Sequence, residues 1–156
     1  MTLDRPVVMS LSFLVTGQPV PYDRNAVAWR TTPPANRAWR ETVRAAFQRV
    51  ADASGHKDFH THEGAVSVHL GFLGERVTSD LDNLSKEVHD ALNGVAWEDD
   101  RQIAWACQER LPRPQNQKDH GVRVTVTYHV ATPDELERAQ AREKARQKRA
   151  TIGGTP

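Results

Sequence analysis

Acidic residues are concentrated in one short stretch of this sequence, between Glu75 and Asp100. The stretch holds eight carboxylates against only two basic side chains, Arg76 and Lys86, so its net charge is −6. Like charges at this density destabilise a fold unless a cation relieves them. Clustered carboxylates that bind a divalent metal ion can hydrolyse phosphodiesters. The stretch therefore predicts a metal-binding phosphodiesterase centre.

Two of these acids, Asp80 and Asp82, are two residues apart, so they share a face only at a turn or where a helix begins. An apolar repeat predicts such a helix from about Leu81 to Leu92, with Ser79 or Asp80 as N-cap and Asn93-Gly94 as its end. Asp80 and Asp82 are the natural first metal ligands. An oxygen-rich site of this kind favours Mg²⁺, or Mn²⁺, over a histidine-bound metal.

Reach along the chain limits the choice of further ligands. Asp90 is ten residues beyond Asp80, about 15 Å along a helix, which is too far to share one ion and predicts a structural role. The connection after Gly94 can extend about 20 Å, enough to return Asp99 or Asp100 to the helix start. Adjacent residues on an extended chain point in opposite directions, so one of the two enters the site. The spacing does not say which.

Lys86 is the basic residue inside the predicted helix. It is one turn from Asp82 and one turn from Asp90, so it can form a salt bridge worth only about 0.3–0.5 kcal/mol. It can also contact a substrate phosphate or orient the attacking water. The two roles are compatible, and we expect Lys86 to act with the acids in catalysis.

Arginines gather in a different part of the chain. Residues 24–49 hold six arginines against Glu41 alone, a net charge of +5. Some fall in a loop that also carries aromatic side chains, and others fall on the flank of a helix predicted from Asn36 to about Ala53. Such residues contact nucleic-acid phosphates, although a solvated surface explains many charge runs. The candidate DNA-binding residues are Arg24, Arg30, Arg37, Arg40, Arg44 and Arg76.

Hydrophobic alternation predicts the remaining elements and a single α+β domain. Strands are expected at 7–16, 64–74, 103–111 and 121–130, with the last two forming a hairpin across a long loop. The order β-α-β-α-β-β predicts a small mixed sheet of about four strands packed with two helices, within residues 1–131. The capping box Thr132-Pro133-Asp134-Glu135 starts a charged C-terminal helix to about Arg149, so residues 132–156 form that helix and a flexible tail.

Hydropathy, the single cysteine and the histidines limit the expected location and the metal chemistry of the protein. No apolar run reaches the length of a membrane span and the start lacks a signal-peptide pattern, so a cytoplasmic protein with no membrane partner is expected. Cys107 is the only cysteine, and its phase with Ile103 and Trp105 predicts a buried strand position. His60 and His62 could place two imidazoles on one side of an extended backbone, but a hydrated loop is the preferred interpretation.

Three motifs follow one another in the acidic stretch: Asp80-Leu81-Asp82-Asn83-Leu84-Ser85-Lys86, then Asp90-Ala91-Leu92-Asn93-Gly94, then Trp97-Glu98-Asp99-Asp100. In this pattern the chain resembles the RusA-type Holliday junction resolvases, over about residues 9–130. These are small, homodimeric, Mg²⁺-dependent endonucleases common in phages and prophages. The chain departs from the family pattern at Glu75-Arg76-Val77-Thr78-Ser79, where members often carry several basic residues.

The resemblance implies metal-binding roles for Asp80, Asp82 and Asp100, with Lys86 as the catalytic or phosphate-contacting lysine. It thereby favours Asp100 over Asp99. It also implies a structure-specific endodeoxyribonuclease that resolves Holliday junctions by paired symmetric nicks in DNA recombination and repair. A homodimer suits this reaction, because a twofold axis supplies two equivalent sites for two symmetric nicks on branched DNA.

Two alternatives to this function remain open from the sequence. One is a non-catalytic module of the same fold that binds branched DNA. The other is a metal-dependent phosphohydrolase for small substrates, which would have no evident need for the arginine-rich helix and loop.

Overall fold

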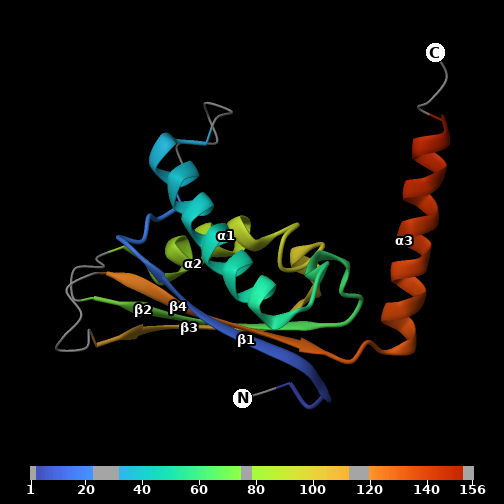
Figure 1. The fold of residues 1–156 in the computed structure, drawn as a ribbon, viewed down its shortest axis with the longest axis horizontal. Helices are drawn as coiled ribbons and strands as arrows, with labels where there is room; N and C mark the ends of the chain where they lie inside the picture. The colour runs from blue at the N-terminus through green and yellow to red at the C-terminus, as the bar shows by residue number, and fades with distance from the viewer. Residues whose placement is uncertain (1–2, 23–31, 75–78, 113–119, 153–156) are drawn as a thin grey trace.

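Two helices lie on one face of a four-stranded sheet, and a third helix stands apart from both (Figure 1). The computed structural model describes residues 3–22, 32–74, 79–112 and 120–152. Its strands are β1 (Val7–Thr16), β2 (Val66–Leu73), β3 (Ile103–Leu111) and β4 (Gly121–His129). Its helices are α1 (Pro34–Ser54), α2 (Leu81–Leu92) and α3 (Pro133–Ile152), with short 3-10 helices at Phe59–Thr61 and Asp100–Gln102. The predicted α+β class, element order and charged C-terminal helix are confirmed.

The sheet is mixed, with the strand order β1-β4-β2-β3. β4 pairs antiparallel with both β1 and β2, whereas β3 pairs parallel with β2. The predicted hairpin between β3 and β4 is therefore wrong, because β2 lies between them. Alternation identifies a strand without naming its partner. Here the β2-α2-β3 unit places β3 parallel to β2 on one side, and β4 takes the other side.

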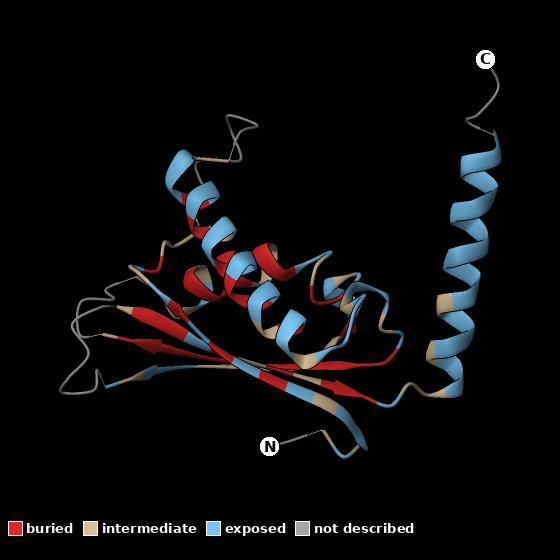
Figure 2. Cartoon of the chain, in the orientation of Figure 1, coloured by how far each residue is buried: buried red, intermediate tan, exposed pale blue. Residues whose placement is uncertain are grey.

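The core lies between the sheet and the two helices α1 and α2. Leu11, Phe13 and Val15 of β1 are buried while the residues between them are exposed, as expected for a strand covered on one face. On α1, Trp39 and Phe47 belong to the buried stripe that meets this face. Figure 2 shows the buried residues of both helices on the sides turned toward the sheet. Each fully buried large side chain stabilises the fold by about 1.5–3 kcal/mol.

Cys107 is less buried than its strand phase predicts. It lies on β3, where Ile103, Trp105 and Cys107 are all only partly buried. Cys107 pairs in register with His69 of β2, away from the apolar positions of β2 that face the helices. The prediction of a buried cysteine is wrong because Cys107 lies on the face of the sheet that α1 and α2 do not cover.

The third helix begins at the predicted capping box. The backbone N–H of Thr132 donates to the Glu135 carboxylate at 2.8 Å, and the Glu135 N–H donates to Thr132 Oγ1 at 3.3 Å. The helix continues to Ile152, slightly beyond the predicted end. The predicted flexible tail falls largely outside the described residues. No helix in the described part of the chain is long and apolar enough to cross a membrane.

Candidate active site

The helix predicted for the acidic stretch is present with the predicted bounds, Leu81–Leu92. Asp80 is its N-cap residue without a side-chain capping hydrogen bond, and Asp82 lies in its first turn. Both residues are exposed. The helix ends at Leu92 with Asn93 as its C-cap, and the next residue, Gly94, has a φ of 77°, a conformation that only a residue without Cβ adopts freely. The start of α2 therefore presents two carboxylates to solvent.

The connection after α2 brings Asp100 back beside that helix. Trp97 is fully buried, and its indole Nε1 donates a hydrogen bond of 2.8 Å to Asp100 Oδ1. The Asp100 side chain lines the same shallow hollow as Asp82, a space of about 260 Å³. The residues that line it are Asp82, Ser85, Lys86, His89, Asp90, Asp100 and Gln108. The connection, which was expected to return Asp99 or Asp100 to the helix start, thus places Asp100 in one hollow with Asp82 of the first turn of α2.

Asp82 is also held by a neutral donor. Gln108 of β3 donates from Nε2 to Asp82 Oδ1 at 2.7 Å. Asp80, in contrast, does not line the hollow. Among residues 3–22, 32–74, 79–112 and 120–152, no three His, Cys, Asp or Glu side chains form a group that could hold a metal ion. The structure therefore brings together two of the three predicted ligands, Asp82 and Asp100.

The donor chemistry of this pair suits a hard divalent cation. Mg²⁺ usually keeps several waters and takes only one or two protein carboxylates together with substrate phosphates. Two exposed carboxylates that face one open hollow, each oriented by an uncharged donor, match that requirement.

Cationic partners divide the acids of this region into two groups. The paired group comprises Glu87 with Arg40 at 2.7 Å, Asp90 with Arg40 at 3.0 Å and Lys86 at 3.3 Å, Glu98 with Arg142 at 3.5 Å, and Asp99 with Arg101 at 3.2 Å. Within the described residues, Asp80, Asp82 and Asp100 form no ion pair. We call these three the unpaired acids. Added positive charge lowers the energy most where carboxylates lack a counter-charge.

Asp99 and Asp100 fall into different groups although they are adjacent. The Asp99 side chain caps the 3-10 helix by accepting from the Arg101 backbone N–H at 2.8 Å. This hydrogen bond, together with the Arg101 side chain, lowers the pKa of Asp99. Asp100 instead faces the hollow. The structure thus gives Asp99 a local structural role, and Asp100 is the acid beside Asp82.

Lys86 lines the hollow, and its ammonium group contacts both a carboxylate and an aromatic ring. Its Nζ is 3.3 Å from Asp90 and 4.6 Å from the centre of the Tyr22 ring. The side chain remains 48% exposed. Of the two predicted salt-bridge partners, Asp90 is the one engaged, which leaves Asp82 without a cation. An incoming phosphate can reach Lys86 from solvent.

His89 and Gln108 belong to the hollow but were missed in the sequence. His89 follows Lys86 by three residues and Asp82 by seven, so helical spacing alone places it on the same side of α2. Burial lowers the pKa of His89 below its ordinary value of 6.5, against the opposing effects of Asp100 and Asp90. Gln108 comes from β3, and no local signal in the sequence connects it to α2.

The predicted DNA-binding arginines of α1 line a second hollow of about 310 Å³ together with Thr32. Arg37 is exposed, and it donates to the Thr32 carbonyl at 3.4 Å. Arg40 is occupied by carboxylates, and its pKa is raised chiefly by the hydrogen bond to Glu87. Arg44 donates from Nε to the carbonyl of Ala91 at 2.8 Å. Arg40 and Arg44 thus join α1 to α2, and Arg37 is the one most available for phosphate.

The remaining predicted arginines, Arg24, Arg30 and Arg76, lie outside the described residues.

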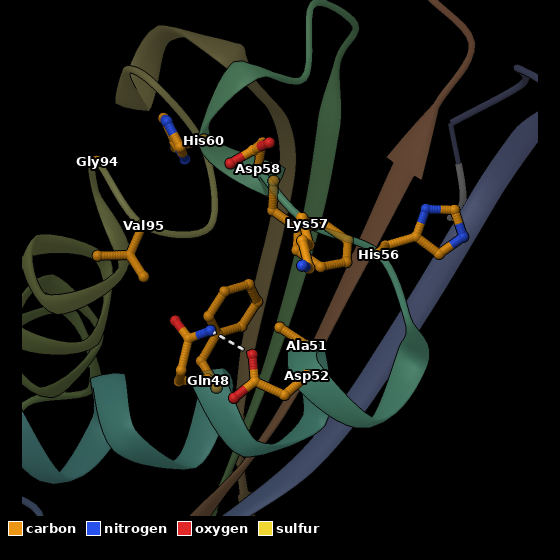
Figure 3. Close-up of a pocket in the computed structure, with 11 residues that line it drawn as sticks. Gln48, Ala51, Asp52, His56, Lys57, Asp58, His60, Gly94 and Val95 are labelled. Atoms are coloured by element: carbon orange, nitrogen blue, oxygen red, sulfur yellow. Dashed lines mark hydrogen bonds between the residues drawn. The ribbon is translucent and has the colours of Figure 1, made fainter.

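The two histidines considered as metal ligands, His60 and His62, are described, and their side chains lie in different places. His60 lines a hollow of about 340 Å³ at the end of α1, which Gly94 and Val95 also line (Figure 3). His62 instead packs edge-on against Tyr128 with ring centres 5.1 Å apart. Their side chains do not meet at one site.

Carboxylates without a counter-charge that line an open hollow beside a lysine could bind a divalent metal ion of the kind that assists phosphodiester hydrolysis. The sequence matches the family described as endodeoxyribonuclease RusA over residues 16–127, a span that includes the whole hollow. The chain therefore belongs to the RusA endodeoxyribonuclease family, nucleases of the Holliday junction resolvase type. The resemblance inferred from the three motifs is confirmed.

The solved structure of CetZ from Methanosaeta thermophila strain DSM 6194 matches with 14% sequence identity and a TM-score of 0.34. The match covers 93% of this chain, which spans only 36% of that protein. No curated protein sequence matches the chain.

Proposed function

We propose that this chain is a Mg²⁺-dependent endodeoxyribonuclease that resolves Holliday junctions by paired symmetric nicks, as a homodimer, in DNA recombination and repair. The observation that carries the metal requirement is the position of Asp82 and Asp100, which face one hollow without a cationic partner in the described structure. Membership of the RusA family supports branched DNA as the substrate. Mn²⁺ is expected to replace Mg²⁺, because both prefer oxygen ligands.

In this proposal Asp82 and Asp100 would hold the cation. Asp80, the N-cap residue of the same helix, lies outside the hollow and would have to turn toward it to act as a third ligand. A divalent ion bound by these carboxylates would supply an activated water and offset charge on the phosphate. Gln108 and Trp97 fix the orientation of the two carboxylates through hydrogen bonds of 2.7 and 2.8 Å without neutralising them. Lys86 of α2 contacts the phosphate, and Arg37, in the first turn of α1, binds the DNA backbone.

The homodimer follows from the reaction. Two nicks at symmetric positions require two equivalent catalytic sites, which a twofold axis provides from one chain. Sedimentation of the full chain alone and with junction DNA should therefore show two copies in the active complex. A single copy per junction would contradict the paired mechanism. It would not bear on the metal site, which the cleavage experiment below tests.

The proposal is tested with a synthetic four-way junction incubated with the full chain and Mg²⁺. Paired nicks should appear, and a chelator should abolish them. Asp82→Asn should reduce cleavage by roughly 10²–10³-fold, because metal-assisted charge stabilisation contributes several kcal/mol and each 1.36 kcal/mol is tenfold. Asp58→Asn is the matched control, since Asp58 is exposed and lines the separate hollow of Figure 3.

Two outcomes would replace this proposal. Tight junction binding without nicks in either Mg²⁺ or Mn²⁺ would indicate the non-catalytic binding module. Hydrolysis of a small nucleotide diester with no cleavage of the junction would indicate the phosphohydrolase. If Asp82→Asn leaves cleavage undiminished, Asp82 is not a metal ligand and the metal centre lies elsewhere in the chain.

A further inference from the structure

The third helix carries an arginine stripe, which we define as Arg138, Arg142, Arg146 and Arg149. The spacings of four, four and three residues each correspond to about one helical turn, so the four side chains lie on one side of α3. At 1.5 Å per residue the stripe is about 16 Å long. Lys144 and Lys148 are also one turn apart, but they lie on the other side of the helix.

The base of the stripe contacts the segment that carries Asp100. Arg142 forms an ion pair of 3.5 Å with Glu98, which precedes Asp100 by two residues. Arg138 and Arg142 line a hollow of about 250 Å³ together with Gln102, at the end of the 3-10 helix that Asp100 begins. From this base α3 extends away from the sheet and the other helices (Figure 1). The stripe therefore leads outward from the segment that positions Asp100.

Between Gln140 and Thr151, α3 has no large apolar side chain that would bury against a protein. Every residue from Gln140 to Thr151 is exposed (Figure 2), and the only large apolar side chain before that stretch is Leu136. Between Arg138 and Arg149 there are six basic residues against Glu143 alone. A helix that is polar all round and rich in cations is suited to an anionic partner, recognised by charge and not by burial.

We propose that the arginine stripe binds the phosphate backbone of a duplex DNA arm as that arm leaves the candidate active site. This inference rests on the proposed function, because it takes the substrate of the hollow to be branched DNA. α3 lies outside residues 16–127, so the stripe is a feature of this chain beyond its family match. Guanidinium groups suit this role because they bind phosphate oxygens in a bidentate manner.

The test compares two double variants of the full chain that remove the same charge from opposite sides of α3. Arg146→Gln with Arg149→Gln removes the outer half of the stripe, and Lys144→Gln with Lys148→Gln is the matched control. All four residues are exposed, and glutamine has a helix propensity close to that of arginine and lysine. Binding to a labelled four-way junction and to a plain duplex is measured with Ca²⁺ in place of Mg²⁺, over a range of salt concentrations.

The stripe variant should bind the junction roughly tenfold more weakly at low salt. Its plot of log affinity against log salt should be shallower by about 1.8, the value for two lost phosphate contacts. The lysine variant should lose clearly less on both measures. Equal losses in the two variants would show a diffuse charge effect, and unchanged affinity in the stripe variant would show a different partner for α3. Either result would overturn the inference.

Failure of the proposed endonuclease function can be distinguished from failure of the inference about the arginine stripe. If the wild-type chain cuts no junction, the stripe still predicts that duplex binding depends on Arg146 and Arg149 and not on Lys144 and Lys148. If the chain cuts junctions, the stripe variant at saturating concentration should keep the wild-type cleavage rate, because neither arginine lies at the hollow. Circular dichroism confirms that α3 remains helical in both variants.

Discussion

The paired acids and the unpaired acids occupy the same short part of the chain but differ in what holds them. Glu87 is almost completely buried, and Arg40 binds both of its carboxylate oxygens, at 2.7 and 2.9 Å. Asp82 and Asp100 are exposed, and uncharged donors hold them at 2.7 and 2.8 Å. A guanidinium neutralises the carboxylate that it binds, whereas an amide or an indole orients a carboxylate and leaves its charge in place.

This difference assigns the paired acids to the stability of the fold and the unpaired acids to catalysis. Arg40 comes from α1, and its ion pairs with Glu87 and Asp90 fasten α1 to α2. The unpaired acids contribute little to that attachment, because their partners come from β3 and from the loop that contains Trp97. We therefore expect substitutions in the first group to reduce the free energy of unfolding and substitutions in the second group to reduce activity.

The largest effect should distinguish two adjacent acids. Asp100→Asn should reduce junction cleavage by about 10²–10³-fold, because it removes a proposed metal ligand. Asp99→Asn should reduce cleavage by less than about tenfold, because its cap on the 3-10 helix can be kept by the asparagine oxygen. Cleavage rates at saturating Mg²⁺ measure both. Equal losses, or a greater loss at Asp99, would break the division between paired and unpaired acids.

The next effect concerns stability. Arg40→Leu should lower the free energy of unfolding by about 3 kcal/mol, because it leaves the buried Glu87 without its partner. Arg37→Leu, one turn earlier on α1 and exposed, is the matched control and should change stability by less than about 0.5 kcal/mol. Urea denaturation followed by circular dichroism measures both. A similar small change in the two variants would show that the Arg40 ion pairs do not fasten α1 to α2.

The smallest effect concerns His89, which lies between the two groups. Burial lowers its pKa below 6.5, while Asp100 and then Asp90 act in the opposite direction. Asp100→Asn should lower the pKa of His89 further, because the nearby negative charge that favours the protonated imidazole is lost. Asp90→Asn should lower it less, because Arg40 and Lys86 already offset the charge of Asp90. NMR titration of the imidazole measures the shifts, and the reverse order would contradict the charge assignment.

The same pKa shift fixes the sign of a pH effect. Below pH 6.5 the unfolded chain takes up a proton at His89 more readily than the folded chain does. The free energy of unfolding should therefore fall as the pH is lowered through that range, by at most about 1.4 kcal/mol per pH unit for one histidine.

Much of this architecture is determined by local sequence patterns. The helix Leu81–Leu92 and the strand Val7–Thr16 have the bounds that apolar periodicity predicts, because each buries one face against the same core. The Thr132 capping box starts α3 where expected, since its hydrogen bonds join residues three apart. The three RusA motifs likewise lie in one continuous stretch, which is why the family could be identified from the sequence.

Contacts between distant segments were decided only in the tertiary structure. Nothing local shows that β4 inserts between β1 and β2, because alternation fixes which side of a strand is buried and not which strand it pairs with. The partners Gln108 and Arg40 reach α2 from β3 and α1, so the sequence revealed a cluster of acids but not which of them are neutralised. That division depends on positions of opposite charges a few ångströms apart, which only the folded chain sets.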